Sequence, residues 1–404
     1  MSSTVAPVAG QKLDYINGLR AIAILGVIWH HYAAFYFNPA DNNVNMVSAA
    51  MGRPIDFAFF PMSGWLGVNL FFFLSGFVLF LPYANGSREI STLKQARAFL
   101  WRRAKRLLPL YYLGGFVCFA LFFRHYIPQS GDWFAAWPGF LTATYIFDPA
   151  TFMPKFNWVY WSLGIEIWFS VLFPLLAFGL RRFPLWPVLL VSSALSVWLR
   201  WEAHKIVGPE PITPQSDNLI HRLPDFLFGM MAAKIFVLGS WAPVLRSYAT
   251  GLIGLFLIVV GMAGFHHWDQ SKLPLSWGSW MPLVINSGFF LFTLFLIMRR
   301  PISFALLRLW PMQIIGMMCY SIYVWHGVVI SGVNVNTFEE RIAYLPAYLV
   351  AMIGISLASY VFVEFPKTSW RELFLIPDNW RLPSRKREPR ASNPPGAEEA
   401  VTAP

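Results

Sequence analysis

The chain has 404 residues, of which 56% are hydrophobic and 13% are charged, with a mean hydropathy of +0.50. Soluble domains carry about 25% charged residues, so this composition excludes an ordinary soluble, disordered or fibrous protein and indicates a multi-pass membrane protein. The net charge of +11 fits loops that face anionic lipid better than nucleic-acid binding. Cys118 and Cys319 both lie in apolar runs, which excludes a disulfide scaffold and a cysteine metal site.

Ten apolar segments predict an all-α fold with about ten transmembrane helices, because each segment approaches the ~20 residues needed to cross a bilayer. In chain order they are 16–37, 66–83, 107–123, 158–180, 184–199, 227–238 with its flanks, 249–265, 279–298, 312–333 and 344–365. A further apolar stretch at 133–147 is too short to cross, and we expect it to lie at the membrane interface or to re-enter the bilayer.

The distribution of lysine and arginine predicts the orientation. With ten spans and a cytoplasmic N-terminus, most of the 31 basic residues fall in cytoplasmic segments, which favours N-in and C-in. We therefore expect a cytoplasmic segment at 1–12, a transmembrane domain at 13–366 and a cytoplasmic tail at 367–404. The tail is rich in proline and charge, which predicts disorder.

Ionisable side chains inside predicted spans are few, and they fall into a pattern. Arg20 and His31 are eleven positions apart, so they share one face of the first helix about 16 Å apart. Counted from the span ends, His31, Glu166 and His326 each lie about 21 Å from the cytoplasmic surface. A histidine and a carboxylate at one depth can form a general base with its orienting partner, or a proton relay in a transporter. Packing of His31 and snorkelling of Arg20 remain the alternative.

A basic cluster precedes the third predicted span. It consists of Arg97, Arg102, Arg103, Lys105 and Arg106. One interpretation is a topological stop that contacts anionic lipid. The other is a phosphate site, because Arg102 and Arg103 are four and three positions from Arg106 and can form a fork on one side of a helix.

Seven short motifs follow one another between residues 13 and 371. They are Leu13 to Arg20 followed by His31; Gly67 to Phe77; Arg102, Arg103 and Arg106 with Leu108 to Tyr111; Trp161 to Glu166 with Phe169 and Pro174; Arg222 to Phe226 with Gly229; Tyr320 to His326; and Glu364 to Pro366 with Arg371. In this order they resemble the acyltransferase-3 family of integral-membrane O-acyltransferases. Asn69 departs from the family pattern, in which an aspartate is common, so a charged role is not expected there.

The resemblance implies a ten-helix enzyme of the bacterial cytoplasmic membrane. Such an enzyme transfers an acyl group, usually acetyl, from cytoplasmic acyl-CoA to a hydroxyl of an extracytoplasmic or lipid-linked glycan. It implies no tightly bound cofactor, no metal and no nucleic-acid partner, with acyl-CoA as a donor substrate and membrane lipids as surroundings. It assigns catalytic roles to Arg20, His31 and Glu166. It assigns donor binding to Arg102, Arg103 and Arg106.

These assignments lead to a mechanistic expectation. The CoA phosphates dock on the arginines, the thioester approaches His31, and His31 removes the acceptor proton with Glu166 as its orienting partner. A covalent acyl-histidine is an open variant. Ser75, Tyr320 and His326 are expected to line the substrate site, with helix packing as the alternative. Two further alternatives are an acyltransferase that acts on a small metabolite or lipid, and a proton-coupled exporter of acylated product.

Overall fold

The computed structural model describes residues 14–32, 59–126, 132–154, 157–180, 183–209, 212–239, 241–333 and 337–366. All regular structure within these residues is helical, which confirms the predicted fold class. In the part of the chain that is described, the ten predicted spans are helical, and the one at 312–333 is divided between two helices. The expected N-terminal segment 1–12, the tail 367–404 and Arg371 lie outside the described residues.

The helices alternate with short connections. The long ones are α1 (Asp14–Tyr32), α4 (Leu66–Ala84), α5 (Leu93–Tyr126), α7 (Tyr160–Gly179), α8 (Leu185–Val207), α10 (Leu219–Leu238), α12 (Tyr248–Asp269), α13 (Ser276–Arg299), α15 (Cys319–Ser331) and α16 (Phe338–Ser359). The shorter ones are α3 (Phe59–Met62), η2 (Ser63–Trp65), α6 (Asp132–Thr142), η4 (Thr144–Phe147), α9 (Pro214–Asp217), α11 (Ala242–Leu245), η5 (Ile302–Arg308), α14 (Trp310–Met317) and the π-helical η6 (Tyr360–Glu364).

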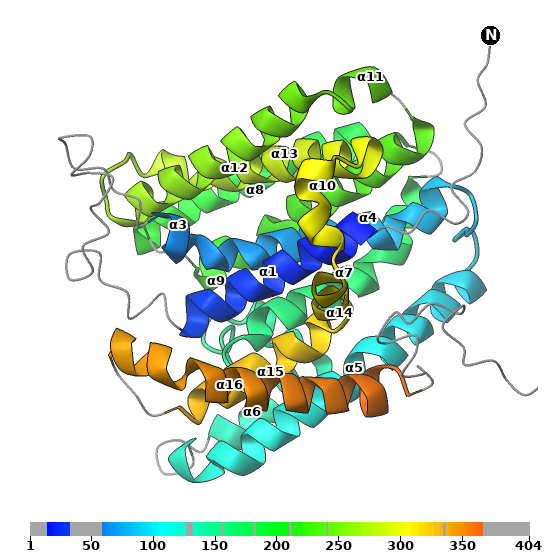
Figure 1. Ribbon diagram of the computed structural model, residues 1–404. Coiled ribbons are helices and arrows are strands. Elements are labelled where there is room, and N and C mark those ends of the chain that lie inside the picture. The colour runs from blue at the N-terminus through cyan, green and yellow to red at the C-terminus, as the bar shows by residue number, and fades with distance from the viewer. Residues whose placement is uncertain are drawn as a thin grey trace, which may run out of the picture. The chain divides into compact units, whose positions relative to one another are not determined.

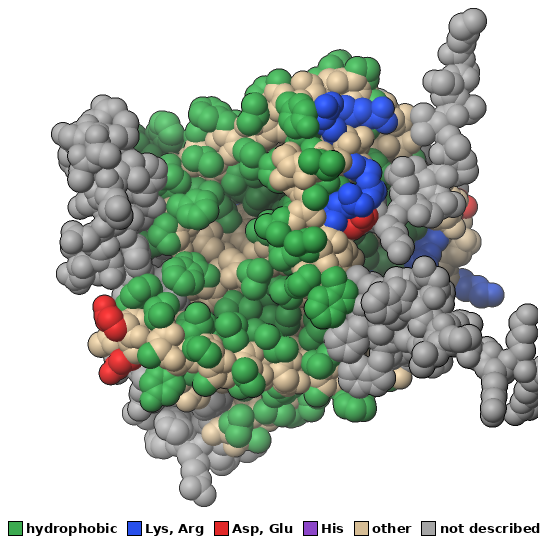
Figure 2. All heavy atoms as spheres, in the orientation of Figure 1, with side chains coloured by type: hydrophobic (Ala, Val, Ile, Leu, Met, Phe, Trp, Pro, Cys, Tyr) green, Lys and Arg blue, Asp and Glu red, His purple; other side chains and the backbone are tan. Residues whose placement is uncertain are grey.

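Five helical segments are long and apolar enough to cross a membrane, or six if one bent pair is a single span. The five are Phe59–Ala84, Tyr160–Gly179, Tyr248–Asp269, Ser276–Arg299 and Phe338–Glu364. Figure 2 shows one face covered largely by hydrophobic side chains, with Lys and Arg gathered towards one end of the helices. The chain is therefore a membrane protein, and ten spans with an N-in orientation remain a prediction.

Helices α1 and α4 lie at the centre of the fold, between α8, α12 and α13 on one side and α5, α6 and α16 on the other (Figure 1). Glycines allow α4 and α10 to pack with their backbones in contact. A Cβ at Gly229 would collide with the carbonyl oxygen of Phe73, and one at Gly76 would collide with that of Phe226. Small residues at such contacts are typical of helix pairs in membranes. This packing fixes the face of α4 that carries Ser75.

The predicted span at 312–333 is not one straight helix. It divides at Met318 into α14 and α15, which are bent by 74° relative to one another. The N-terminus of α15 is therefore inside the fold, and Cys319 and Tyr320 in its first turn line a cavity. A break of this kind exposes backbone N–H groups that a continuous helix would use internally.

The stretch at 133–147 forms the helices α6 and η4, and α6 has only 11 residues, which is too few to cross a bilayer. It packs on α5 and α7, where Tyr145 is buried and donates a hydrogen bond to the Tyr160 carbonyl. This segment therefore supports the wall of the site formed by α7.

Candidate active site

Five helices converge on a cavity of about 110 Å³, which is enough space for several water molecules. The polar residues that line it are Arg20 on α1, Ser75 on α4, Arg103 and Arg106 on α5, Ser162 and Glu166 on α7, and Cys319, Tyr320 and Tyr323 on α15. The remaining wall is apolar and includes Phe71 and Phe72. The cavity thus places three guanidinium groups, one carboxylate and several hydroxyl groups beside an apolar wall.

Two of the three arginines keep their charge available. Arg103 and Arg106 are three positions apart on α5, so both face the cavity. The Nη2 of Arg103 lies 2.6 Å from the Oε1 of Glu166, and its Nε donates to the Oγ of Ser170 at 3.1 Å. Among the described residues, neither Arg20 nor Arg106 makes a hydrogen bond or ion pair; Arg106 lies over the ring of Phe365, and both arginines interact electrostatically with the buried Glu364.

Arg102 does not join this group. Its side chain is exposed on the outer face of α5 and does not line the cavity. The expected fork of three arginines is therefore corrected to Arg103 with Arg106, joined by Arg20 from α1. The sequence could not decide which helix face turns inwards, because both Arg102 and Arg103 lie within one turn of Arg106.

Glu166 is not the partner of His31. Its carboxylate bonds to Arg103 within the cavity, whereas the described polar partner of His31 is His326. The structure brings the two histidines together and pairs the glutamate with Arg103, which lies in the long basic first half of α5.

The two histidines form a contact between α1 and α15. The Nδ1 of His31 lies 2.9 Å from the Nε2 of His326, and the two rings are nearly parallel at 12° with centroids 5.2 Å apart. The edge contact of Trp158 with His31 has a centroid distance of 4.4 Å. His31 is partly exposed and His326 is fully buried, so His31 is the more accessible of the two imidazoles.

The residues expected to line the substrate site have different places. Ser75 lines the cavity, and its hydroxyl has no hydrogen-bond partner within the described residues. Tyr320 also lines the cavity, but its hydroxyl donates to the Leu107 carbonyl at 2.6 Å. His326 does not line the cavity, and its ring contacts His31 instead. Ser75 is therefore the one with an available donor, and Tyr320 ties α15 to α5.

Sequence reasoning gave no role to Tyr323 or Glu364, although both lie in quoted motifs. The ring of Tyr323 lines the cavity and its carbonyl accepts from His326 at 2.6 Å, so this residue connects the cavity to the histidine pair. Glu364, at the end of the π-helical η6, accepts a hydrogen bond from Ser321 in the first turn of α15. Tyr323 is three residues from His326, and Glu364 is 43 residues from Ser321. Neither spacing indicated a contact before the break at Met318 was known.

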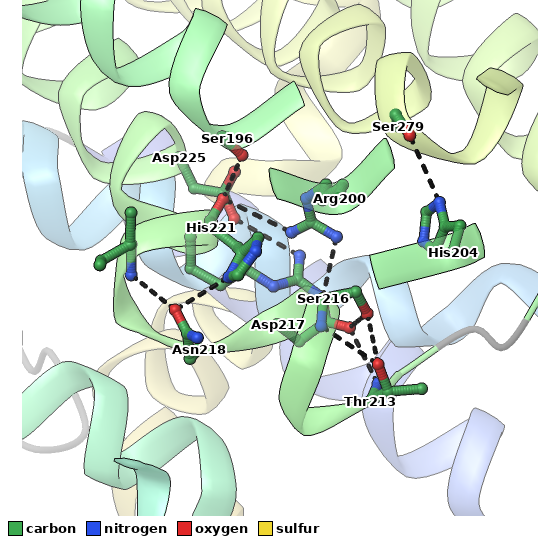
Figure 3. Close-up of polar contacts among 12 residues, drawn as sticks. Ser196, Arg200, His204, Thr213, Ser216, Asp217, Asn218, His221, Asp225 and Ser279 are labelled. Carbon is green, nitrogen blue, oxygen red and sulfur yellow. Dashed lines mark hydrogen bonds and ion pairs between the residues drawn. The ribbon is translucent and has the colours of Figure 1, made fainter. Parts of the chain in front are cut away.

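A second buried polar cluster joins α8, α9, α10 and α13 (Figure 3). The Oδ1 of Asp217 lies 3.1 Å from Arg200 Nη1 and 2.7 Å from Arg222 Nη2. Asp225 pairs with Arg222 at 3.5 Å and accepts from Asn286 at 2.6 Å. Two cations balance two anions, and the ionic side chains are at most 3% exposed. This cluster is an internal tie between helices and is not a site for a charged substrate.

Asp217 lies outside the predicted spans, in the connection between α8 and α10. Burial by itself would raise the pKa of its carboxyl, but the charges of Arg222 and Arg200 and hydrogen bonds from Ser216 and Thr213 lower the pKa to about 2. Asp217 is therefore ionised at neutral pH.

Asn69, the departure from the family pattern, is buried on α4 and lies outside the cavity lining. Its side-chain amide has no hydrogen-bond partner among the described residues.

Comparison with known proteins identifies the family of this chain. Residues 13–361 match the family model described as an acyltransferase domain, so the chain belongs to the acyltransferase-3 family. The O-acetyltransferase OatA of Staphylococcus aureus strain NCTC 8325 / PS 47 is 28% identical over 380 residues, covering 88% of this chain and 57% of that protein. A putative O-acetyltransferase of Staphylococcus aureus strain COL is 27% identical over 400 residues, covering 92% of this chain and 60% of its own length.

The chain spans a little over half the length of these curated relatives. No solved structure matches it.

Proposed function

We propose that this protein is a membrane O-acyltransferase that moves an acyl group, most simply acetyl, from cytoplasmic acyl-CoA to a hydroxyl of an extracytoplasmic or lipid-linked glycan. Family membership supports acyl transfer, and the names of the relatives support O-acetylation. The glycan acceptor and the bacterial cytoplasmic membrane come from the resemblance of the motifs. The observation that carries the proposal is a cavity with unpaired arginines, joined through α1 and Tyr323 to a reachable histidine.

Donor binding depends on the positive charge of the arginines that line the cavity. The groups that line the cavity are Arg20, Arg103 and Arg106 against Glu166, a formal charge of +2 beside the N-terminus of α15. Glu364 lies outside the lining and its carboxylate interacts electrostatically with Arg106 and Arg20, so three cations face two anions and the region stays net positive. Phosphates bind such places because guanidinium forks and exposed helix N–H groups both favour anions. CoA carries its phosphates at one end of a long, thin chain. We therefore place its phosphate-bearing end at the arginines.

Acyl transfer requires that a donor bound at the arginines extend as far as His31. His31 lies eleven residues beyond Arg20 on α1, about 16 Å along the helix axis. The thioester of a donor held at the arginines is carried towards His31 by its pantetheine arm. An acceptor hydroxyl has a pKa far above 7, so its attack needs a general base, and we assign that role to His31. Ser75 has a free donor for the thioester carbonyl oxygen.

A matched pair of arginine variants tests the donor site. Arg106→Gln removes a charge that faces the cavity, and Arg102→Gln removes an exposed charge four residues earlier on the same helix. A charge-assisted contact contributes about 1.5–3 kcal/mol, so we expect Arg106→Gln to raise the KM for acetyl-CoA by roughly 10- to 100-fold. Arg102→Gln should change it less than about 3-fold. Equal effects of the two variants would refute the proposed donor site.

The histidine contact also supports a second candidate. Two imidazoles at 2.9 Å can pass a proton, as a proton-coupled exporter requires. The two functions differ in what drives them, because transfer consumes acyl-CoA without a membrane potential and a relay follows a proton gradient. Turnover of acetyl-CoA by protein in nanodiscs, which hold no gradient, favours the enzyme. Gradient-driven flux in sealed vesicles without acyl-CoA favours the exporter.

A further inference from the structure

Three polar atoms form a chain behind His31, and their chemistry fixes the position of each proton. The Nδ1 of His326 lies 2.6 Å from the carbonyl oxygen of Tyr323. The Nε2 of the same ring lies 2.9 Å from the Nδ1 of His31. The described surroundings offer no carboxylate to this chain, because Glu166 bonds to Arg103 and the other ring neighbours of His31 are His30 and Trp158.

The position of each proton follows from the Tyr323 carbonyl, at one end of the chain of hydrogen bonds. A backbone carbonyl can only accept, so the Nδ1 of His326 must carry a hydrogen. A neutral imidazole has one N–H, so the Nε2 of His326 presents a lone pair and accepts from the Nδ1–H of His31. The Nε2 of His31 is then left with a lone pair and no proton. His31 is held in the tautomer that a general base requires at this nitrogen.

We propose that His326 is a positioning residue that holds His31 in its Nδ1–H tautomer and makes Nε2 the basic atom for acyl transfer. The Nε2 of His326 accepts the hydrogen bond from His31 that a carboxylate accepts in other pairs of a catalytic histidine and its partner. This inference rests on the proposed function and deepens it, because it names the reacting atom and its support. His326 itself is fully buried and does not touch the substrate.

The transfer step balances with this assignment. The hydroxyl proton of the acceptor goes to Nε2 of His31 as the acceptor oxygen forms a bond to the thioester carbonyl carbon. The C–S bond then breaks, the acyl group stays on the acceptor oxygen, and the CoA sulfur takes the proton back from Nε2. Throughout, the Nδ1–H of His31 keeps its acceptor on His326.

Two amide substitutions separate tautomer control from simple packing. The amide of His326→Asn reaches only as far as Nδ1, so it can keep the bond to the Tyr323 carbonyl but loses the acceptor for His31. The amide oxygen of His326→Gln reaches the position of Nε2 and can still accept from His31. We expect Gln to retain kcat within about 10-fold of wild type. Asn should lose at least about 100-fold, since a wrong catalytic tautomer costs up to ~10⁴-fold in a serine protease.

Nitrogen NMR of protein with ¹⁵N-labelled histidine gives a readout that does not depend on activity. The resonances that disappear in His31→Ala should report a protonated Nδ1 and an unprotonated Nε2 in the wild type. In His326→Asn we expect this preference to be lost, and in His326→Gln to be kept.

The outcomes are distinct. Activity of Asn equal to or above Gln, or a protonated Nε2 on neutral His31, overturns the inference while leaving the acyltransferase proposal in place. Wild-type protein that shows the expected tautomer but no turnover of acyl-CoA with any acceptor overturns the proposed function instead.

Discussion

Glu166 contacts Arg103 in the donor site and not His31, and a double-mutant cycle can measure the energy of the Arg103–Glu166 ion pair. Arg103 Nη2 lies 2.6 Å from Glu166 Oε1, and the two side chains are only 12% and 15% exposed. A hydrogen bond with a charged partner contributes about 1.5–3 kcal/mol. Because both groups are largely withdrawn from water, little of this is lost to screening. We therefore expect a coupling energy in that range.

The cycle uses Glu166→Gln, Arg103→Gln and the double variant. The assay is the free energy of unfolding of the purified protein in mixed micelles as the fraction of denaturing detergent is raised. Each single variant leaves the other charge without its partner, so the double variant should lose less than the sum of the two. A second cycle that combines Glu166→Gln with His31→Ala should be additive to within about 0.5 kcal/mol. Coupling to His31, with additivity to Arg103, would refute the placement of Glu166.

Three further predictions concern other parts of the fold. Asp217→Asn leaves Arg200 and Arg222 short of a buried counter-charge, so unfolding should become easier by about 3–5 kcal/mol, against less than about 1 for the exposed Glu202→Gln. Because the pKa of Asp217 is lowered to about 2, its contribution is present above about pH 4 and is lost as the pH falls towards 2, and Asp217→Asn should remove this part of an acid titration of stability. Equal stability of the two variants, or an unchanged acid titration, would contradict this. Gly229→Ala should destabilise by about 1–3 kcal/mol because its Cβ meets the Phe73 carbonyl, whereas Gly354→Ala, which meets nothing, should be neutral or stabilising; the same sign for both would contradict the close packing of α4 and α10. In a Cys118→Ala background, CoA should slow alkylation of Cys319 several-fold, and Arg106→Gln should abolish that protection; alkylation that CoA leaves unchanged would place the donor elsewhere.

Hydropathy was sufficient to locate the helices but not their faces. The described parts of the predicted spans are helical, although 312–333 is divided between two helices, because an apolar run long enough for the bilayer leaves the backbone few alternatives. The break at Met318 was not predicted, since no proline or charge interrupts residues 312–333. In the structure α14 packs closely on α1, with Gly316 against the backbone of Asn17. That break is what brings Cys319 and Tyr320 to the cavity.

The candidate site was predicted in part. The expected proximity of His31 and His326 is confirmed by their contact, and Arg103 and Arg106 of the basic cluster line the cavity. Donor binding by these arginines stays a prediction. The pairing of Glu166 with Arg103 depends on how α5 packs against α7, which one sequence does not contain. The role of His326 as support for His31 required knowledge of which ring atoms meet.

The most direct test of the account is release of free CoA from acetyl-CoA by the purified protein in nanodiscs, with and without a crude envelope glycan extract. Wild-type protein is measured beside His31→Ala and the exposed-charge control Arg102→Gln. The account predicts acceptor-dependent release that Arg102→Gln retains and His31→Ala loses by at least about 100-fold, because removal of a general base costs 10²–10⁴-fold. Release that continues unchanged in His31→Ala, or folded wild-type protein that releases no CoA with any donor and acceptor, would contradict it.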